Sequence, residues 1–355
     1  MSNFTFPVQL NATLPNCSSL VECVDTVPLS ANDYFVEAAR IFVFFPISVI
    51  GACLSLLSFA VLRRQEFNSR FFEFLRIYAL NSFTINILDA LFNTATWHFA
   101  ALNQYYTMLF YADKIFLPLQ STGYFFGAAI DSVIVLERIK LVETKHVFLN
   151  QFPPKLIAIS IYLTCLFINL PMFFNFNPKG HIVMFNSQPF EFYTTQVTEF
   201  ATSRLGIIMA WTANVLRDVV TLVLEVCLNV YLLVAMRKFL RNKRSIMFHS
   251  ARTNRVVIVT DPSSSATNSR ANADLNKEKN LTTMVTVMCC FSSAVHLVIL
   301  FGSIYYTFFL TSTAYSIYVL SVLMISIKHA STFFLFFFLN KQFKAKLVSF
   351  ISKSN

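Results

Sequence analysis

Ionisable side chains inside otherwise apolar stretches are the residues whose chemistry most needs a partner in this sequence. A charge at the centre of a bilayer costs roughly 2.5 to 3.5 kcal/mol, so such groups are expected to face one another inside a helix bundle. We expect Lys328 to pair with Asp89 or with Asp131, either as a static link between helices or as a switch. The full candidate polar network is Asp89, Asp131, Arg217, Asp218, Glu225 and Lys328.

Catalytic and metal-binding chemistry is not expected from the other side chains. The sequence shows no nucleophile–base spacing, no metal-ligand spacing and no phosphate-binding glycine loop, and its six His are scattered. Cys290 lies near His296, but it falls in an apolar run and is expected to be a core residue. We therefore expect a protein that is not an enzyme and that holds no cofactor or metal.

The composition is that of an integral membrane protein. Of the 355 residues, 55% are hydrophobic and only 13% are charged, whereas soluble domains carry about 25% charged residues. The net charge of +10 could indicate nucleic-acid binding. However, the Lys and Arg residues form short clusters between apolar runs, which is typical of membrane topology and excludes a nucleic-acid partner.

Seven apolar runs reach the length of about twenty residues that a membrane-spanning helix needs. They are residues 41–62, 77–101, 109–136, 156–174, 205–236, 282–310 and 316–339. They lack the period-two alternation of barrel strands, so we expect an all-α membrane protein with a seven-transmembrane helix bundle. The predicted organisation is a polar segment 1–38, the bundle 39–340 and a tail 341–355.

Glycosylation sequons and basic loops predict the same orientation in the plasma membrane. The sequons begin at Asn3, Asn11 and Asn16, in a segment without Lys or Arg where Cys17 and Cys23 could form a disulfide. Most of the 28 Lys and Arg fall in stretches that would then face the cytoplasm. We expect an extracellular amino terminus without a cleaved signal peptide, and a cytoplasmic carboxyl terminus.

Three segments outside the runs complete the prediction. The inner loop 237–281 contains a Ser-rich stretch poor in apolar residues and is expected to be partly disordered. Phosphorylation at Ser263, Ser264 or Ser265 would permit an arrestin-like partner to bind there. The outer loop 175–203 is rich in Phe and polar residues and could cover a pocket, but its pattern assigns it no secondary structure. Apolar side chains at helical spacing in the tail 341–355 predict a short amphipathic helix that lies on the inner leaflet. These side chains are Phe343, Leu347, Phe350 and Ile351.

Two short motifs resemble those of the rhodopsin-like G-protein-coupled receptors. Glu137-Arg138-Ile139 ends the third run, where the family has an acid, then Arg, then usually an aromatic residue. Asn340-Lys341-Gln342-Phe343-Lys344 follows the seventh run and is similar to the junction between the family's last transmembrane helix and its surface helix. The first helix's Asn, the Cys-Trp-x-Pro and Asn-Pro-x-x-Tyr motifs and the interhelical disulfide are missing, which indicates a divergent invertebrate receptor of chemosensory or orphan type.

The resemblance implies a receptor that binds an extracellular small molecule or peptide and activates a heterotrimeric G protein, with Glu137, Arg138 and Ile139 as the coupling switch. The alternatives are a transporter, whose charged positions line an ion path, and a ligand-gated channel of the chemoreceptor kind, whose amino terminus would lie inside. Ligand-pocket candidates on the outer halves of the helices are Gln120, Tyr124, Trp211, His296 and Tyr305.

Overall fold

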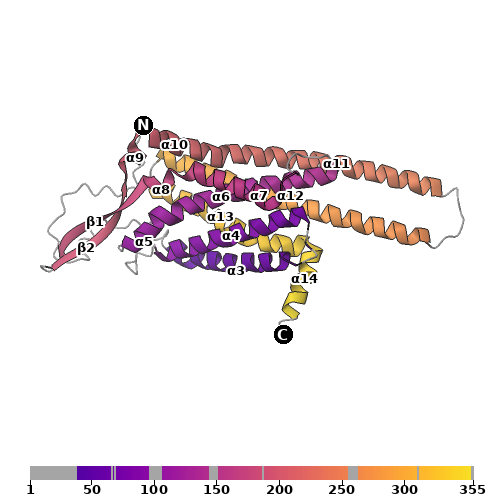
Figure 1. The fold of residues 1–355 in the computed structure, drawn as a ribbon, viewed down its shortest axis with the longest axis horizontal. Helices are drawn as coiled ribbons and strands as arrows, with labels where there is room; N and C mark the ends of the chain where they lie inside the picture. The colour runs from indigo at the N-terminus through magenta and orange to yellow at the C-terminus, as the bar shows by residue number, and fades with distance from the viewer. Residues whose placement is uncertain are drawn as a thin grey trace.

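The computed structural model describes residues 38–64, 67, 69–95, 106–143, 151–185, 188–254, 263–309 and 312–352. The predicted glycosylation sites Asn3, Asn11 and Asn16 and the predicted Cys17–Cys23 disulfide lie outside the described residues. Within the described part of the chain, long helices run back and forth beside one another, and a two-stranded hairpin lies at one end of them (Figure 1).

Seven long helical segments follow one another along the described chain, three of which contain π-helical turns, labelled η. The α14 helix follows the last of them after a bend of 100°. The helical elements are η1 (Arg40–Phe44) with α3 (Phe45–Leu62); α4 (Arg70–Ala95); α5 (Tyr106–Phe110), η4 (Tyr111–Phe116) and α6 (Leu117–Glu143); α7 (Pro154–Asn169) with α8 (Met172–Asn175); the short α9 (Glu199–Thr202); α10 (Arg204–Asn214), η6 (Val215–Val220) and α11 (Thr221–Asn254); α12 (Ser263–Phe309); α13 (Ser312–Leu339); and α14 (Lys341–Ser352).

The α6 helix lies at the centre of the packing, where it contacts α4, α7, α11 and α12. Ile130 and Ile134 on this helix are fully buried, and so is Asp131 between them. The α13 helix packs against α12, α3 and α4 and brings a second set of buried polar side chains next to α6. Polar groups in this interior are removed from water, so they need partners on neighbouring helices.

Five segments of the described chain are long and apolar enough to cross a membrane by themselves, which makes this a multi-pass helical membrane protein. The bent pair Leu323–Leu339 and Lys341–Phe350 would provide a sixth. The α4 helix is not among them, although its 26 residues span about 39 Å at the helical rise of 1.5 Å per residue. The five are Arg40–Leu62, Tyr106–Lys140, Pro154–Asn175, Arg204–Phe239 and Asn280–Tyr305.

A β-hairpin occupies most of the stretch 175–203, to which the sequence pattern assigned no secondary structure. Strands β1 (Phe176–Phe185) and β2 (Gln188–Val197) pair antiparallel, with Phe176 opposite Val197 and Phe185 opposite Gln188. Both strands are rich in Phe, Val, Ile, Thr and Tyr, which favour extended backbone. The rings of Tyr106 on α5 and Tyr193 on β2 meet edge to face at 5.3 Å. This end of the molecule is called the hairpin end below.

The opposite end, called the α14 end below, carries two helices that extend well past the others (Figure 1). The α11 helix continues to Asn254 and α12 begins at Ser263, whereas we expected a partly disordered loop over 237–281. Residues 255–262 lie outside the described residues. The first turns of α12 are poor in apolar residues, but they contain neither Gly nor Pro, and a helix that is stable in the bundle propagates through such a sequence.

The expected amphipathic helix after the last run is α14. Asn340 caps it, because its Oδ1 accepts hydrogen bonds from the backbone N–H groups of Gln342 at 3.0 Å and Phe343 at 3.1 Å. The buried Phe343 ring packs against Phe333 and Phe336 of α13, with centroids 5.9 and 5.6 Å apart. The predicted junction therefore anchors α14 to the foot of α13.

Candidate functional site

An ion pair between α6 and α13 forms the centre of the candidate site. Lys328 Nζ lies 3.2 Å from Asp131 Oδ2, and the two side chains are only 5% and 1% exposed. Of the two acids predicted as partners for Lys328, the structure thus selects Asp131. Because both charges are buried, each depends on the other for compensation.

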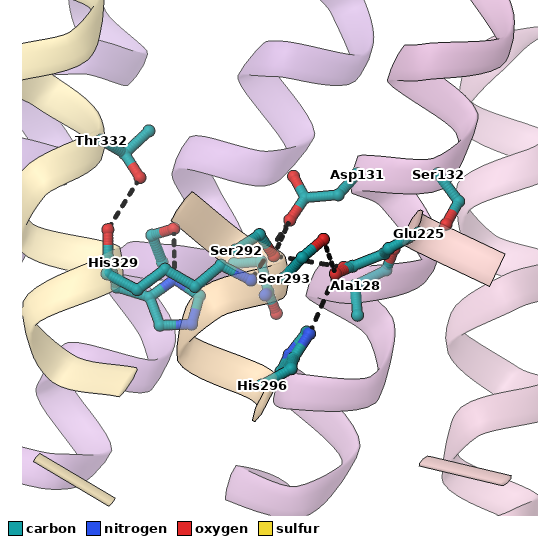
Figure 2. A network of polar contacts seen from close by, with 12 residues as sticks. Ala128, Asp131, Ser132, Glu225, Ser292, Ser293, His296, His329 and Thr332 are labelled. Carbon is teal, nitrogen blue, oxygen red and sulfur yellow. Dashed lines mark hydrogen bonds and ion pairs between the residues drawn. The ribbon is translucent and has the colours of Figure 1, made fainter. Parts of the chain in front are cut away.

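A serine on α12 links this ion pair to a second carboxylate on α11. Ser292 Oγ lies 3.1 Å from Asp131 Oδ2 and 3.1 Å from Glu225 Oε1. The other oxygen, Glu225 Oε2, lies 3.1 Å from His296 Nδ1 and 3.3 Å from Ser293 Oγ. Figure 2 shows these contacts as a continuous chain from Asp131 through Ser292 and Glu225 to His296. Sequence analysis missed the two serines, because an isolated Ser in a membrane helix usually bonds its own backbone.

The carboxylate of Asp89 belongs to another cluster, closer to the hairpin end. Its Oδ1 accepts a hydrogen bond from Gln120 Nε2 at 2.5 Å and its Oδ2 accepts one from Ser326 Oγ at 2.9 Å. Gln120 also contacts the Tyr124 hydroxyl at 2.9 Å. The alternative pairing of Asp89 with Lys328 is therefore not the one the structure adopts.

His329 connects the two clusters and was not among the predicted residues. Its Nδ1 lies 2.8 Å from Ser82 Oγ of α4, and its ring stacks on Tyr124 with the centroids 6.1 Å apart. It follows Lys328 directly in α13, so the same turn of helix contacts α4 and α6. The sequence signal was the adjacent Lys and His in an apolar run, of which we considered only the Lys.

Arg217 and Asp218 form a third polar unit on the π-helical turn η6. Arg217 Nε and Nη2 lie 2.7 and 2.9 Å from the two carboxylate oxygens of Asp218, a bidentate arrangement. Arg217 also contacts Asn214 Oδ1 at 3.1 Å and, on α6, Ser121 Oγ at 3.4 Å. The pair is largely self-compensated, so it needs no acid from another helix.

The predicted ligand-pocket residues separate into two groups. Gln120, Tyr124 and His296 belong to the clusters described above. Trp211 on α10 is 55% exposed and Tyr305 on α12 is 39% exposed, and the Tyr305 ring packs on Phe309 of its own helix at 4.5 Å. The structure brings neither of these two side chains to the polar clusters.

The Glu137-Arg138 motif lies buried at the α14 end of α6. Glu137 Oε1 accepts a hydrogen bond from Arg70 Nε at 2.7 Å, which ties the end of α6 to the start of α4, and Lys140 Nζ lies 3.7 Å from its Oε2. Arg138 is only 2% exposed, and its guanidinium lies 3.9 Å from the centroid of the Phe71 ring. The role of the first turn of α4 in holding this motif was missed by sequence analysis.

The other two members of the sequence motifs pack into the same region. Ile139, which stands where the related receptors usually have an aromatic residue, is buried in the hydrophobic core. Phe343 of the junction motif is a member of the same core cluster. Both motifs that carried the resemblance therefore contribute a residue to the same hydrophobic core, although about 200 residues separate them in the sequence.

A comparison of the chain with protein-family models finds no match, and a comparison with curated proteins finds none either. Among the described residues, no group of three or more His, Cys, Asp or Glu side chains is placed to hold a metal ion. The candidate site offers buried charges and hydrogen bonds between helices, which can store a preference for one helix arrangement over another.

Proposed function

We propose that the chain is a G-protein-coupled receptor of the plasma membrane with seven spans, its hairpin end outside the cell and its α14 end in the cytoplasm. The observation that carries the proposal is the closed arrangement around Arg138, which is buried against Phe71 while the neighbouring Glu137 is held by Arg70. A buried arginine beside a clamped acid, at the end of the central helix, is a group that a change in helix packing would release.

The orientation is supported by the distribution of positive charge. Arg63 and Arg64 directly follow α3 at the α14 end, and Lys341 and Lys344 are exposed on α14. Arg64 lies over the Phe350 ring at 5.3 Å, so the end of α3 and the end of α14 meet. Basic residues concentrate on the cytoplasmic side of membrane proteins.

The proposed signal passes from the hairpin end to the α14 end. A small molecule or peptide that contacts the cluster around Gln120 and Tyr124 would favour one arrangement of α4, α6 and α13, since the three helices meet in that cluster. The rearrangement frees Arg138, and a heterotrimeric G protein binds against the ends of α6, α11 and α12. The ligand needs an affinity difference of a few kcal/mol between the two arrangements to shift their populations.

A ligand-independent experiment tests this proposal. Glu137→Gln removes the charge that Arg70 holds, so it should raise basal G-protein activation, measured in cells by energy transfer between labelled Gα and Gβγ subunits over a panel of Gα types. The matched control is Glu199→Gln, which removes one charge at an exposed site on α9, at the hairpin end and away from the proposed G-protein contact. Adding Arg138→Ala should abolish the increase.

The proposal would be wrong if Glu137→Gln and wild type, present at equal amounts on the cell surface, gave the same basal signal with every Gα type. It would be equally wrong if Arg138→Ala left an existing basal signal unchanged.

A transporter is the second candidate, because a chain of ionisable groups at membrane depth is also typical of proton and ion pathways. The chain from Lys328 through Asp131 and Glu225 to His296 is the observation that favours it. Reconstitution into liposomes loaded with a pH-sensitive dye separates the candidates. A proton or cation flux that Glu225→Gln abolishes would favour the transporter, whereas a receptor gives no flux above that of empty liposomes.

A further inference from the structure

The charges of the network in Figure 2 do not cancel. With both carboxylates ionised, Lys328 protonated and His296 neutral, Asp131, Glu225 and Lys328 leave one negative charge in excess. All three side chains are buried. An uncompensated charge in an apolar interior is strongly unfavourable, so the network needs one more positive charge to be stable in this arrangement.

The hydrogen bonds of Ser292 also indicate that the network holds one additional proton. The Ser292 hydroxyl has one hydrogen to donate, but its oxygen lies 3.1 Å from a carboxylate oxygen of Asp131 and 3.1 Å from one of Glu225. An ionised carboxylate only accepts hydrogen bonds. Both contacts are full hydrogen bonds only if one of the two acids is itself protonated and donates to Ser292. In addition, the other oxygen of Asp131, Oδ1, is buried and has no hydrogen-bond partner among the described residues.

The surrounding titratable groups do not supply the missing charge. Tyr78 of α4 and Cys289 of α12 face Asp131, Glu225 and Lys328, and Cys290 follows next along the helix, but Tyr and Cys side chains are neutral or negative and never positive. His329 of α13 contacts Ser82 and lies next to the charged Lys328, which opposes a second positive charge there. The proton that balances the charge therefore lies on one of the two carboxylates that Ser292 joins, and His296 Nδ1, 3.1 Å from Glu225 Oε2, closes the site from the α12 side.

We propose that Asp131, Ser292 and Glu225, closed by Lys328 and His296, form a proton-binding site shared between α6, α11, α12 and α13. The bound proton completes the hydrogen bonds of Ser292 and removes the excess negative charge. When the proton leaves to solvent, two carboxylates face each other across one hydroxyl, and their repulsion separates α11 and α12 from α6. The link to signalling rests on the function proposed above, whereas the proton site itself does not. In that receptor the proton stabilises the resting arrangement, so alkaline pH favours signalling.

Infrared difference spectroscopy tests the site without ligand or G protein. The full chain in nanodiscs of zwitterionic lipid is titrated from acidic to alkaline pH, and the C=O stretch of buried protonated carboxylic acids is recorded. We expect a band that disappears as the pH rises in the wild type and that is lost at all pH values in Glu225→Gln, because the amide mimics the protonated acid and carries no excess charge. The band should persist in the matched control Glu143→Gln, which neutralises a partly exposed acid on α6.

Two outcomes would overturn the proton site. One is a titration of the wild type in which no such band is seen at any pH. This outcome is obtained from the wild type alone, so it does not depend on whether a variant folds. The other is a band that survives in Glu225→Gln but vanishes in Asp89→Asn, because the proton would then belong to the separate cluster on α4.

The coupling to signalling has its own test. Basal G-protein activation of the wild type should rise with pH, and Glu225→Gln should lose that dependence. A titrating band together with basal activation that does not change with pH leaves the proton site intact and refutes the regulatory step, whereas the proposed function is decided separately by the Glu137→Gln and Arg138→Ala variants.

Discussion

Removing the charge of Lys328 is the most direct perturbation of the buried network. Lys328→Met keeps most of the side-chain volume but leaves Asp131 without its partner at 3.2 Å. Coulomb's law with an effective dielectric constant of about 20 gives an attraction of about 5 kcal/mol at that distance. Part of it offsets the desolvation of the two groups, and the loss of one member of a buried pair typically costs about 3–5 kcal/mol. We expect the free energy of unfolding to fall by about that amount.

The pair is distinguished from general damage by a double-mutant cycle. Lys328→Met combined with Asp131→Asn removes both charges at once and should recover a large part of the loss, with a coupling energy of about 0.5–3 kcal/mol. The measurement is the midpoint of unfolding by SDS in mixed micelles, with circular dichroism as the readout. Lys341→Met, on an exposed side chain of α14, is the matched control and should leave the midpoint unchanged.

A double variant as unstable as the sum of the two single variants would refute the assignment of this pair. A single variant with wild-type stability would show that Asp131 finds compensation elsewhere, and the network described here would then not hold α6 to α13.

Three further predictions concern other contacts. Gly51→Ala should destabilise by about 1–3 kcal/mol in the same SDS titration, because its Cβ would lie 2.8 Å from Asn86 Oδ1, and adding Asn86→Ala should restore most of the loss. Asn340→Ala removes the cap of α14 at a cost of about 1 kcal/mol and should raise the mobility of a spin label on that helix. Phe71→Ala removes the ring below Arg138 and should raise basal G-protein activation. If the variant and the wild type, compared at equal amounts on the cell surface, gave the same basal activation, the result would count against the proposed switch.

The sequence contains enough information to find the long helices but not the side-chain partners between them. Each predicted run overlaps a described helix, and five of these segments are long and apolar enough to cross a membrane by themselves. The sequence, in contrast, left two candidate partners for Lys328, Asp89 and Asp131. Which of them it contacts depends on how α4, α6 and α13 are offset along their axes, and only the packing of the helices determines that offset. Arg70 was not predicted as the partner of Glu137 for the same reason, since 67 residues separate them.

The hairpin and the ends of α11 and α12 were missed for different reasons. The stretch after Asn175 contains residues that favour strands, but we gave more weight to its polar residues and its position between two runs. The stretch after Pro262 was interpreted from its low apolar content, although helix continuity depends more on the absence of Gly and Pro and on a stable helix to extend.

The α4 helix shows why an average over a whole segment can underrate a membrane helix. Its polar residues lie mainly on one buried face, at spacings of three and four: Ser82, Asn86, Asp89 and Asn93. Leu80, Ile87 and Leu91 are exposed on the other side, where a bilayer would meet them. The hydropathy averaged over the whole helix combines the two faces, so it falls below that of the five segments apolar enough to cross a membrane by themselves. Lipid would contact only the apolar face. The polar face is at the same time the one that contacts α6 and α13, so the residues that weaken the apparent hydropathy of α4 are those that build the candidate site. This distribution supports including α4 among the seven spans that the proposed function requires.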